Sequence, residues 1–249
     1  IFEDKMPFIK IGDIKLLICN NYYLKESKKK ICLSFTNTVN FLRTLGIKPK
    51  IIIDIGACWG ECSIYLASKY KNSHILSIEG SFKNYEVFKK NLLHNPEHNG
   101  NIHPYHFILS DKDGYEEISD SLSTMNVIKK NNLHQKINMN KFEKVKSYTL
   151  SSFLKKKNIS KIDFVKIDIE GSELNLVKDL LNFDIRAMQI EIIHYNDINK
   201  NLNFLYEFNK NYKFHRPSTW EKIDFIKIKE LVKNEFKDNL SIDIFLSKA

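Results

Sequence analysis

Apolar and polar residues alternate in a regular order from residue 51 onward. Short continuous apolar runs, the first of them at 51–53, are typical of strands buried on both faces. Between these runs, apolar residues recur every three or four positions, which predicts helices with one buried face. The later strands are predicted at 75–78, 105–109, 163–167, 188–193, 212–215 and 242–246, and the helices at 63–70, 82–92, 151–157, 174–181 and 202–208. Strands that alternate with helices indicate βαβ units and a mostly parallel sheet.

The first 46 residues do not follow this alternation. Val39, Leu42 and Leu45 have helical spacing, and Gly46 is a suitable C-cap. We therefore divide the chain into a partly helical N-terminal lead-in, 1–46, and one main domain, 47–249. The chain begins with isoleucine instead of methionine, so we expect a fragment or a processed form, and whether further domains flank it stays open.

The strongest chemical signal follows the first predicted strand, in Asp-Ile-Gly-Ala-Cys-Trp-Gly at 54–60. Gly56 and Gly60 allow the backbone to approach a ligand, and the helix that follows offers free N–H groups. A dinucleotide fingerprint would also need glycine at positions 58 and 61, which are cysteine and glutamate here. The loop therefore does not predict an NAD site.

Two acids at the ends of successive strands favour another cofactor. Asp54, before the glycines, suits a ligand that carries positive charge, and Glu79 can accept hydrogen bonds from both hydroxyls of a ribose. S-Adenosylmethionine has an ammonium, a sulfonium and a ribose, and it has no phosphate. Either acid alone would also fit an ordinary α/β protein, but the pair favours this cofactor.

Candidate catalytic residues follow the two later central strands. Asp168 leaves a buried strand at the carboxyl edge of the sheet, and Glu170 comes two residues later, where it could equally begin a helix. His194 follows the next strand and is a candidate general base, although it could merely cap that strand. Asp168, Glu191 and His194 could also bind a divalent metal. Because no paired-carboxylate motif is present, we expect no metal.

Charge and cysteine content exclude several classes of protein. The formal net charge is +9, but only three of the 39 lysine and arginine residues are arginine, and arginine is the residue preferred for phosphate and base contacts. This composition argues against nucleic acid as a partner. The four cysteines form no disulfide framework, so we expect a reduced, cytoplasmic protein. No apolar run approaches the roughly 20 residues of a membrane span.

Several motifs together resemble the FkbM-type family of class I methyltransferases. They are Asp-Ile-Gly-Ala-x-x-Gly (54–60), Ser-Ile-Glu (77–79), Leu-Ser-Asp-Lys-Asp-Gly (109–114), Tyr-Thr-Leu-Ser-Ser-Phe-Leu (148–154), Lys-Ile-Asp-Ile-Glu-Gly-Ser-Glu (166–173) and Gln-Ile-Glu-Ile (189–192). They cover roughly residues 50–215. The resemblance implies an α/β, Rossmann-like fold with a seven-stranded, mostly parallel sheet, an antiparallel last strand and helices on both faces.

The resemblance also implies roles for individual residues around S-adenosylmethionine. Its methionine part would be bordered by Asp54, Gly56, Ala57 and Gly60, and Cys58 in the same loop would also contact the cofactor. Glu79 would hold the ribose, Ser110 and Asp111 would lie near the adenine, and Asp168 would lie at the reactive end. The chain departs from the family at Cys58, where asparagine is frequent, and at Gly80, where proline is frequent.

The predicted function is O-methyl transfer to a hydroxyl of a sugar or polysaccharide precursor. The acceptor is a small molecule or a glycan, including one linked to a nucleotide or a phosphate. Two alternatives remain open, namely an N- or RNA methyltransferase and a binding module that has lost the cofactor. RNA recognition would call for arginines interleaved with aromatic residues. Intact Asp54, Gly56, Gly60 and Glu79 argue against a module without cofactor.

Overall fold

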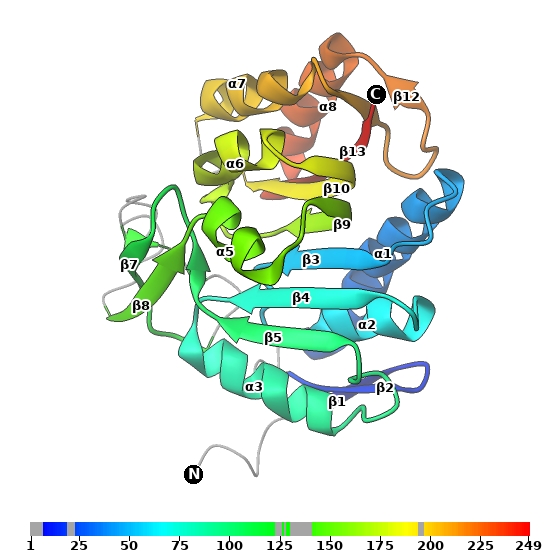
Figure 1. Cartoon of the computed structure of the whole chain (residues 1–249). Coiled ribbons are helices and arrows are strands. Elements are labelled where there is room, and N and C mark those ends of the chain that lie inside the picture. The colour runs from blue at the N-terminus through cyan, green and yellow to red at the C-terminus, as the bar shows by residue number, and fades with distance from the viewer. Residues whose placement is uncertain (1–6, 19–22, 123–125, 127, 130–140, 194–196) are drawn as a thin grey trace.

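The protein is described by a computed structural model (Figure 1). The structure describes residues 7–18, 23–122, 126, 128–129, 141–193 and 197–249, with the backbone alone for 23–33 and 238. No helix within these ranges is both long enough and apolar enough to cross a membrane.

An eight-stranded sheet forms the centre of the described chain, in the order β12-β11-β13-β10-β9-β3-β4-β5. Its strands in chain order are β3 (Ile51–Ile55), β4 (His74–Glu79), β5 (Ile102–His106), β9 (Lys161–Ile167), β10 (Asp184–Ile193), β11 (Tyr212–His215), β12 (Lys222–Ile223) and β13 (Ser241–Lys248). Strands β5, β4, β3, β9 and β10 are parallel, whereas β13 runs antiparallel between β10 and β11. From β3 the chain continues to β4 and β5 on one side of the sheet, and it later adds β9 and β10 on the other side of β3. The strand order therefore reverses between β3 and β9. Such a reversal opens a crevice at the carboxyl ends of the strands.

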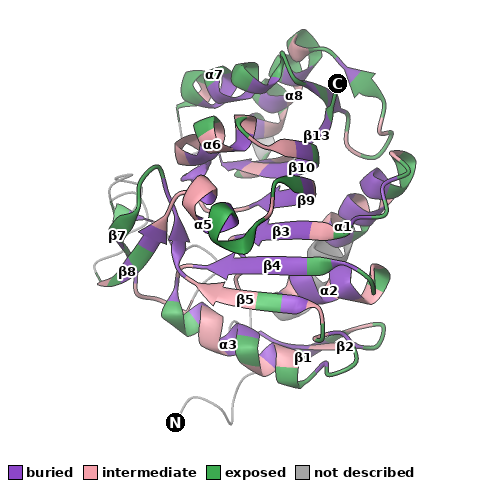
Figure 2. Ribbon diagram, in the orientation of Figure 1, coloured by how far each residue is buried: buried purple, intermediate pink, exposed green. Residues whose placement is uncertain are grey.

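Helices cover both faces of this sheet. The helices are α1 (Tyr23–Thr44), α2 (Glu61–Lys69), α3 (Phe82–Leu93), α5 (Leu150–Lys157), α6 (Val177–Leu181) with the 3-10 turn η3 (Glu173–Leu176) before it, α7 (Ile198–Phe208) and α8 (Phe225–Asp238). Ile52 packs with α1, α2 and α3, while its neighbour Ile53 packs with α5, α6, α7 and α8. Both isoleucines are fully buried because successive strand residues point to opposite faces. Figure 2 shows the buried strands between helices that are exposed on their outer sides.

Two smaller units complete the fold. The hairpin β1 (Phe8–Ile11) and β2 (Ile14–Leu17) lies against α3, where the Asn91 side chain bonds both backbone groups of Leu17. A second sheet consists of β6 (Ile108–Leu109), β7 (Gly114–Ser119) and β8 (Phe142–Tyr148). It lies beyond the carboxyl ends of β4 and β5, on the left of Figure 1.

The predicted α/β fold is confirmed, including the antiparallel last strand, and β12 is a two-residue addition to the seven expected strands. One strand was predicted wrongly. The run 105–109 belongs to two strands, because β5 ends at His106 and Ile108 pairs with Ser147 in the smaller sheet. The lead-in is tied to the main domain, since Phe41 and Leu42 of α1 are completely buried in the core beneath the large sheet.

Candidate functional site

A cavity of about 320 Å³ lies at the carboxyl ends of β3, β4 and β9, where the strand order reverses. Its floor is the loop between β3 and α2. The N–H groups of Gly56 and Ala57 both donate to the carbonyl oxygen of Ile78, at 2.9 Å each. Gly56 has φ 82°, and a Cβ added there would lie 1.8 Å from the carbonyl oxygen of Asp168. The glycine is therefore required by the close crossing of two backbone segments under the cavity.

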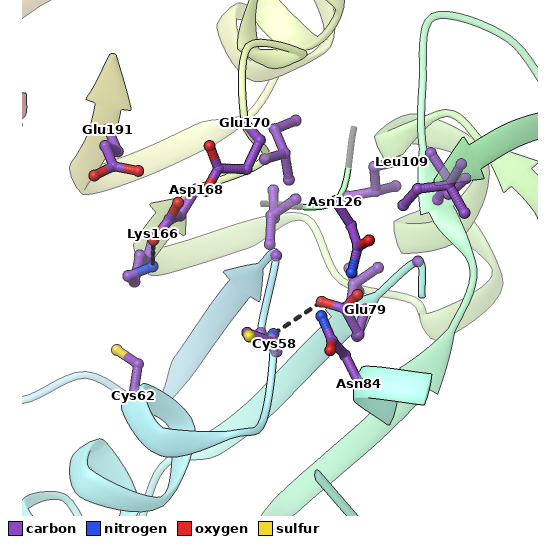
Figure 3. Close-up of a pocket in the computed structure, with 18 of the residues that line it drawn as sticks. Cys58, Cys62, Glu79, Asn84, Leu109, Asn126, Lys166, Asp168, Glu170 and Glu191 are labelled. Atoms are coloured by element: carbon purple, nitrogen blue, oxygen red, sulfur yellow. Dashed lines mark hydrogen bonds and ion pairs between the residues drawn. The ribbon is translucent and has the colours of Figure 1, made fainter. Parts of the chain in front are cut away.

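Glu79 lies at one end of the cavity, as the last residue of β4. Its Oε2 accepts the N–H of Cys58 at 2.8 Å, and its Oε1 accepts the N–H of Ser81 at 2.7 Å (Figure 3). Burial raises the pKa of this carboxyl to about 8, although the two N–H groups act in the opposite direction. Each oxygen keeps a further lone pair, so the group can still accept hydrogen bonds from a ligand.

An apolar wall continues from Glu79 along the smaller sheet. It consists of Phe107, Ile108, Leu109, Ile118 and Ile128. The side-chain amides of Asn84 and Asn126 add polar groups to this end of the cavity. A flat apolar ring with polar edges would fit between them.

Three carboxylates gather at the other end of the cavity (Figure 3). The acid cluster consists of Asp168, Glu170 and Glu191, whose oxygens approach within 4.8 Å of one another. The ammonium of Lys166, on a side chain only 8% exposed, lies 2.7 Å from Oδ2 of Asp168. This lysine supplies one positive charge inside the cluster. The spacing of the three oxygens would also suit a cation. The sequence offered a metal site on Asp168, Glu191 and His194, although no metal was expected.

The pKa shifts in the acid cluster follow from burial and from Lys166. Burial by itself raises the pKa of Asp168, but the Lys166 ammonium and a hydrogen bond with Glu191 outweigh it and lower the pKa. Burial and the negative charge of Asp168 raise the pKa of Glu191 to about 11. Burial, followed by the charges of Asp168 and Glu173, raises the pKa of Glu170 well above its usual value. Asp168 is therefore the ionised member, and Glu191 is neutral and donates to it.

Glu61 is a further acid in the cavity that the sequence did not reveal as a site residue. It begins α2, and its Oε2 accepts the N–H of Trp59 at 3.1 Å. Burial raises its pKa to about 7. Lys166 was missed as well, although a lysine within the apolar strand 163–167 is a visible signal of a buried charge.

Two predicted cofactor residues lie outside the cavity lining. Asp54 is completely buried beneath it, and its Oδ2 accepts the hydroxyl of Ser63 at 2.6 Å. Gly60 is needed for packing, because a Cβ there would lie 1.9 Å from the Phe88 ring. Asp54 and Gly60 thus shape the loop from below, whereas Gly56, Ala57 and Cys58 face the cavity.

Ser110 and Asp111, predicted beside the adenine, are also absent from the lining. The Ser110 hydroxyl is buried and lies 3.0 Å from both Asp111 Oδ1 and Glu116 Oε1. The apolar residues just before them, Phe107–Leu109, form the wall instead. His194 lies outside the described residues.

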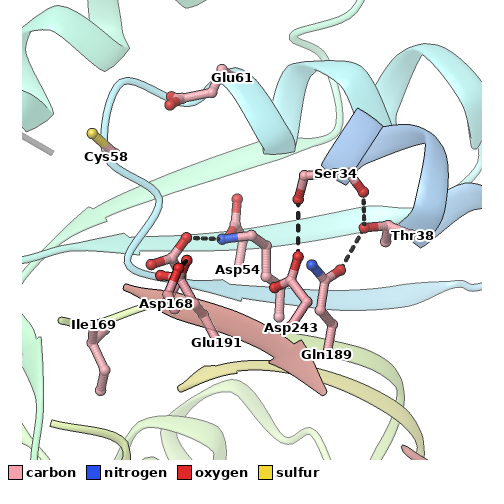
Figure 4. A network of polar contacts seen from close by, with 12 residues as sticks. Ser34, Thr38, Asp54, Cys58, Glu61, Asp168, Ile169, Gln189, Glu191 and Asp243 are labelled. Atoms are coloured by element: carbon pink, nitrogen blue, oxygen red, sulfur yellow. Dashed lines mark hydrogen bonds and ion pairs between the residues drawn. The ribbon is translucent and has the colours of Figure 1, made fainter. Parts of the chain in front are cut away.

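A polar network extends from the acid cluster to α1 and β13 (Figure 4). Ser241 Oγ donates to Oε1 of Glu191 at 2.7 Å, and Ser34 Oγ donates to Oδ2 of Asp243 at 3.4 Å. Glu191 and Asp243 are opposite each other on β10 and β13. The carboxyl edge of the sheet is therefore acidic and hydrogen-bonded well beyond the cavity.

Comparison with known proteins gives one family. Residues 54–216 match the family model described as the methyltransferase FkbM domain. No curated protein matches the chain.

The solved structures that the chain resembles are distant. One is precorrin-6y C5,15-methyltransferase from Geobacter metallireducens GS-15, with 11% identity over 99% of this chain and 95% of that chain and a TM-score of 0.49. Another is Trm1 from Pyrococcus horikoshii in complex with S-adenosyl-L-methionine. The match has 13% identity, covers 98% of this chain and 61% of that chain, and has a TM-score of 0.49. A third is TYW2 from M. jannaschii in complex with AdoMet, with 10% identity, 98% and 84% covered and a TM-score of 0.45. With TM-scores under 0.5, these likenesses carry no conclusion about this chain.

Proposed function

The chain belongs to the FkbM methyltransferase family, and on this premise we propose that it methylates a hydroxyl oxygen of a sugar or polysaccharide precursor. It is an S-adenosylmethionine-dependent methyltransferase. The hydroxyl and the sugar are the proposal. They are supported by the arrangement of the cavity. At one end, Glu79 can accept hydrogen bonds from a ribose, and at the other end lies the ionised carboxylate of Asp168.

The residues of the cavity fit the cofactor part by part. The apolar wall 107–109, with Ile118 and Ile128, suits the adenine, and the Glu79 carboxylate suits the two ribose hydroxyls. Gly56 and Ala57 leave space beside the backbone, and Glu61 suits the positive charge of the amino-acid part. When bound, S-adenosylmethionine supplies an electrophilic methyl group on a sulfonium.

The acid cluster is the single observation that carries the proposed acceptor chemistry. An ionised carboxylate can accept a hydrogen bond directly from the hydroxyl group of an acceptor molecule. Asp168, ionised and fixed by Lys166, can hold the acceptor hydroxyl in line with the cofactor end of the cavity. Fixed alignment of this kind supplies a large part of the rate in group transfer.

The same cluster contains the proposed proton acceptor. A base works best when its pKa approaches the working pH, so the lowered pKa makes Asp168 a poor choice. Glu170 lines the cavity, and because burial and neighbouring acids raise its pKa, its carboxylate is a stronger base than that of Asp168. We therefore propose that Glu170 accepts the proton of the acceptor hydroxyl. His194, the base predicted from the sequence, is the alternative to be tested beside it.

The test uses polysaccharide precursors extracted from cells that lack the protein, incubated with purified protein and methyl-labelled S-adenosylmethionine. We expect label on a sugar oxygen, located by mass spectrometry. Label on RNA or on nitrogen would overturn the proposed acceptor, and absence of cofactor binding by calorimetry would leave only a binding module.

Variants separate the two bases. Glu170→Gln should lower kcat by roughly 10²-fold or more while cofactor affinity stays within a few-fold, because the group serves the acceptor. The exposed Glu230→Gln, on α8, is the matched control. If His194→Ala shows the large loss and Glu170→Gln does not, the base is His194.

Finally, the free thiols of Cys58 and Cys62 suit a reducing compartment, so we propose that the reaction takes place in the cytoplasm.

A further inference from the structure

A second, open hollow lies beside the acid cluster, at the same edge of the sheet. It is lined by residues of α1, α8, β13 and the loop after β11, among them Asn37, Arg216, Ser218, Glu235 and Asp243. Ser241 also lines the hollow, and its hydroxyl donates to Glu191 in the acid cluster at 2.7 Å. Asp243 accepts a hydrogen bond from Ser34, which lines the first cavity. Side-chain hydrogen bonds therefore connect the linings of the hollow and of the first cavity, and Figure 4 shows the one between Ser34 and Asp243.

The loop that carries Arg216 is held in a strained conformation. It joins β11 to β12, and both Ser218 (φ 70°) and Trp220 (φ 58°) adopt left-handed backbone angles. Such angles are rare for bulky residues and persist only where the surroundings enforce them. Here the Trp220 ring packs against Phe41 and Phe245, with ring centroids 5.5 and 5.0 Å away.

Hydrogen bonds fix the same loop from below. The ring of His215 is buried, with Nδ1 3.0 Å from the carbonyl oxygen of Trp220 and Nε2 2.8 Å from Oγ of Ser247. The carbonyl can only accept, so Nδ1 carries the proton and Nε2 accepts from the Ser247 hydroxyl. Within the loop, the Arg216 N–H donates to Glu221 and the Trp220 N–H donates to Arg216, both at 2.9 Å. The backbone of Arg216 is thus satisfied, and its position over the hollow is fixed.

The Arg216 side chain itself has room for a ligand. It is exposed, and within the described part of the chain no ion pair or side-chain hydrogen bond engages it. Arg186, in contrast, donates to Asp163 at 3.2 Å near the amino end of β10. An unpaired guanidinium on a fixed backbone is suited to bind a carboxylate or a phosphate through two parallel hydrogen bonds.

We propose that this hollow binds the acceptor, and that Arg216 recognises an anionic oxygen group on it, a phosphate or a carboxylate. The inference rests on the proposed function and narrows its acceptor to a negatively charged sugar. Charge orients the acceptor, because Arg216 attracts its anionic group. The hydroxyl to be methylated then faces the cluster. Glu235, Asp243 and Asn37 supply the further hydrogen-bonding groups that a polyol needs.

The test measures binding of glucose 1-phosphate, glucuronate and glucose by calorimetry, with S-adenosylmethionine titrated separately into each variant. We expect the wild type to bind at least one of the two anionic sugars, and Arg216→Ala to weaken that binding about tenfold or more. Arg216→Lys should recover only part of it, since an ammonium cannot form the two parallel bonds. Arg186→Ala is the matched control and should leave sugar binding within about twofold.

The outcomes distinguish the two levels of the proposal. Binding of the phosphate alone or of the carboxylate alone identifies the anionic group. If Arg216→Ala binds both sugars as the wild type does, or if glucose binds as tightly as the anionic sugars, the inference is overturned while the methyltransferase assignment stands. If the wild type fails to bind S-adenosylmethionine, the proposed function fails whatever the sugars do.

Discussion

Replacing Gly56 with alanine tests whether the crossing of two backbone segments forms the cavity floor. A left-handed φ costs an L-residue about 1–2 kcal/mol. The new Cβ would also lie 1.8 Å from the Asp168 carbonyl oxygen and 3.0 Å from Cγ2 of Ile169, so the loop or β9 must move. Overpacking of this kind costs about 1–3 kcal/mol. We therefore expect Gly56→Ala to lower the free energy of unfolding by about 2–5 kcal/mol.

Gly46 provides the matched control. It has φ +65°, and nothing lies within 4 Å of an added Cβ, so Gly46→Ala should show only the backbone cost of about 1–2 kcal/mol. Guanidinium denaturation of both variants isolates the contact with Asp168, provided that the dependence on denaturant is unchanged. S-Adenosylmethionine calorimetry should show weaker binding for Gly56→Ala alone, because Gly56 and Asp168 both line the cavity. Equal stability and equal affinity in the two variants would refute this account of the glycine.

Four further predictions follow from the cavity. Glu79→Ala should weaken S-adenosylmethionine binding by about 1–3 kcal/mol in calorimetry, since a buried hydrogen-bond acceptor is lost; unchanged affinity would place the ribose elsewhere. Asp54→Ala should mainly lower the melting temperature, because this buried carboxylate lies outside the lining; a loss of affinity larger than that of Glu79→Ala would contradict this. Burial raises the pKa values of Glu61 and Glu79 to about 7 and 8, above their values in the unfolded chain. The melting temperature should therefore be highest in mild acid and fall as the pH rises from about 5 to 8. A melting temperature that rises over this range would show that these acids are ionised in the folded state. Cofactor binding and methyl transfer should survive chelation by EDTA, because the Lys166 ammonium already balances charge in the acid cluster; loss of activity that magnesium or manganese restores would show that the cluster binds a metal.

Much of the fold could be predicted from local pattern. The parallel strands carry unbroken apolar runs because both of their faces are covered, and the helices between them carry apolar residues at helical spacing. Helix α8 was missed although its signals are present, namely the N-cap Asp224 and the buried Ile228, Val232 and Phe236 in an otherwise lysine-rich stretch. The division of the run 105–109 could not be read locally, since pairing with β8 depends on contacts far apart in the chain.

The sequence by itself predicted that the glycine loop after the first strand and the acid Glu79 would lie together, as they do at one end of the cavity. Gly56 follows β3 and Glu79 ends β4, and the carboxyl ends of parallel strands share one edge of the sheet, so their meeting follows from order along the chain. Only the tertiary structure decided the rest. Lys166 and Glu61 line the cavity, while Asp54, Ser110 and Asp111 lie outside its lining, because the direction of a side chain depends on strand register and helix placement. The position of Arg216 likewise depends on the packing of Trp220 against α1 and β13, which no local pattern encodes.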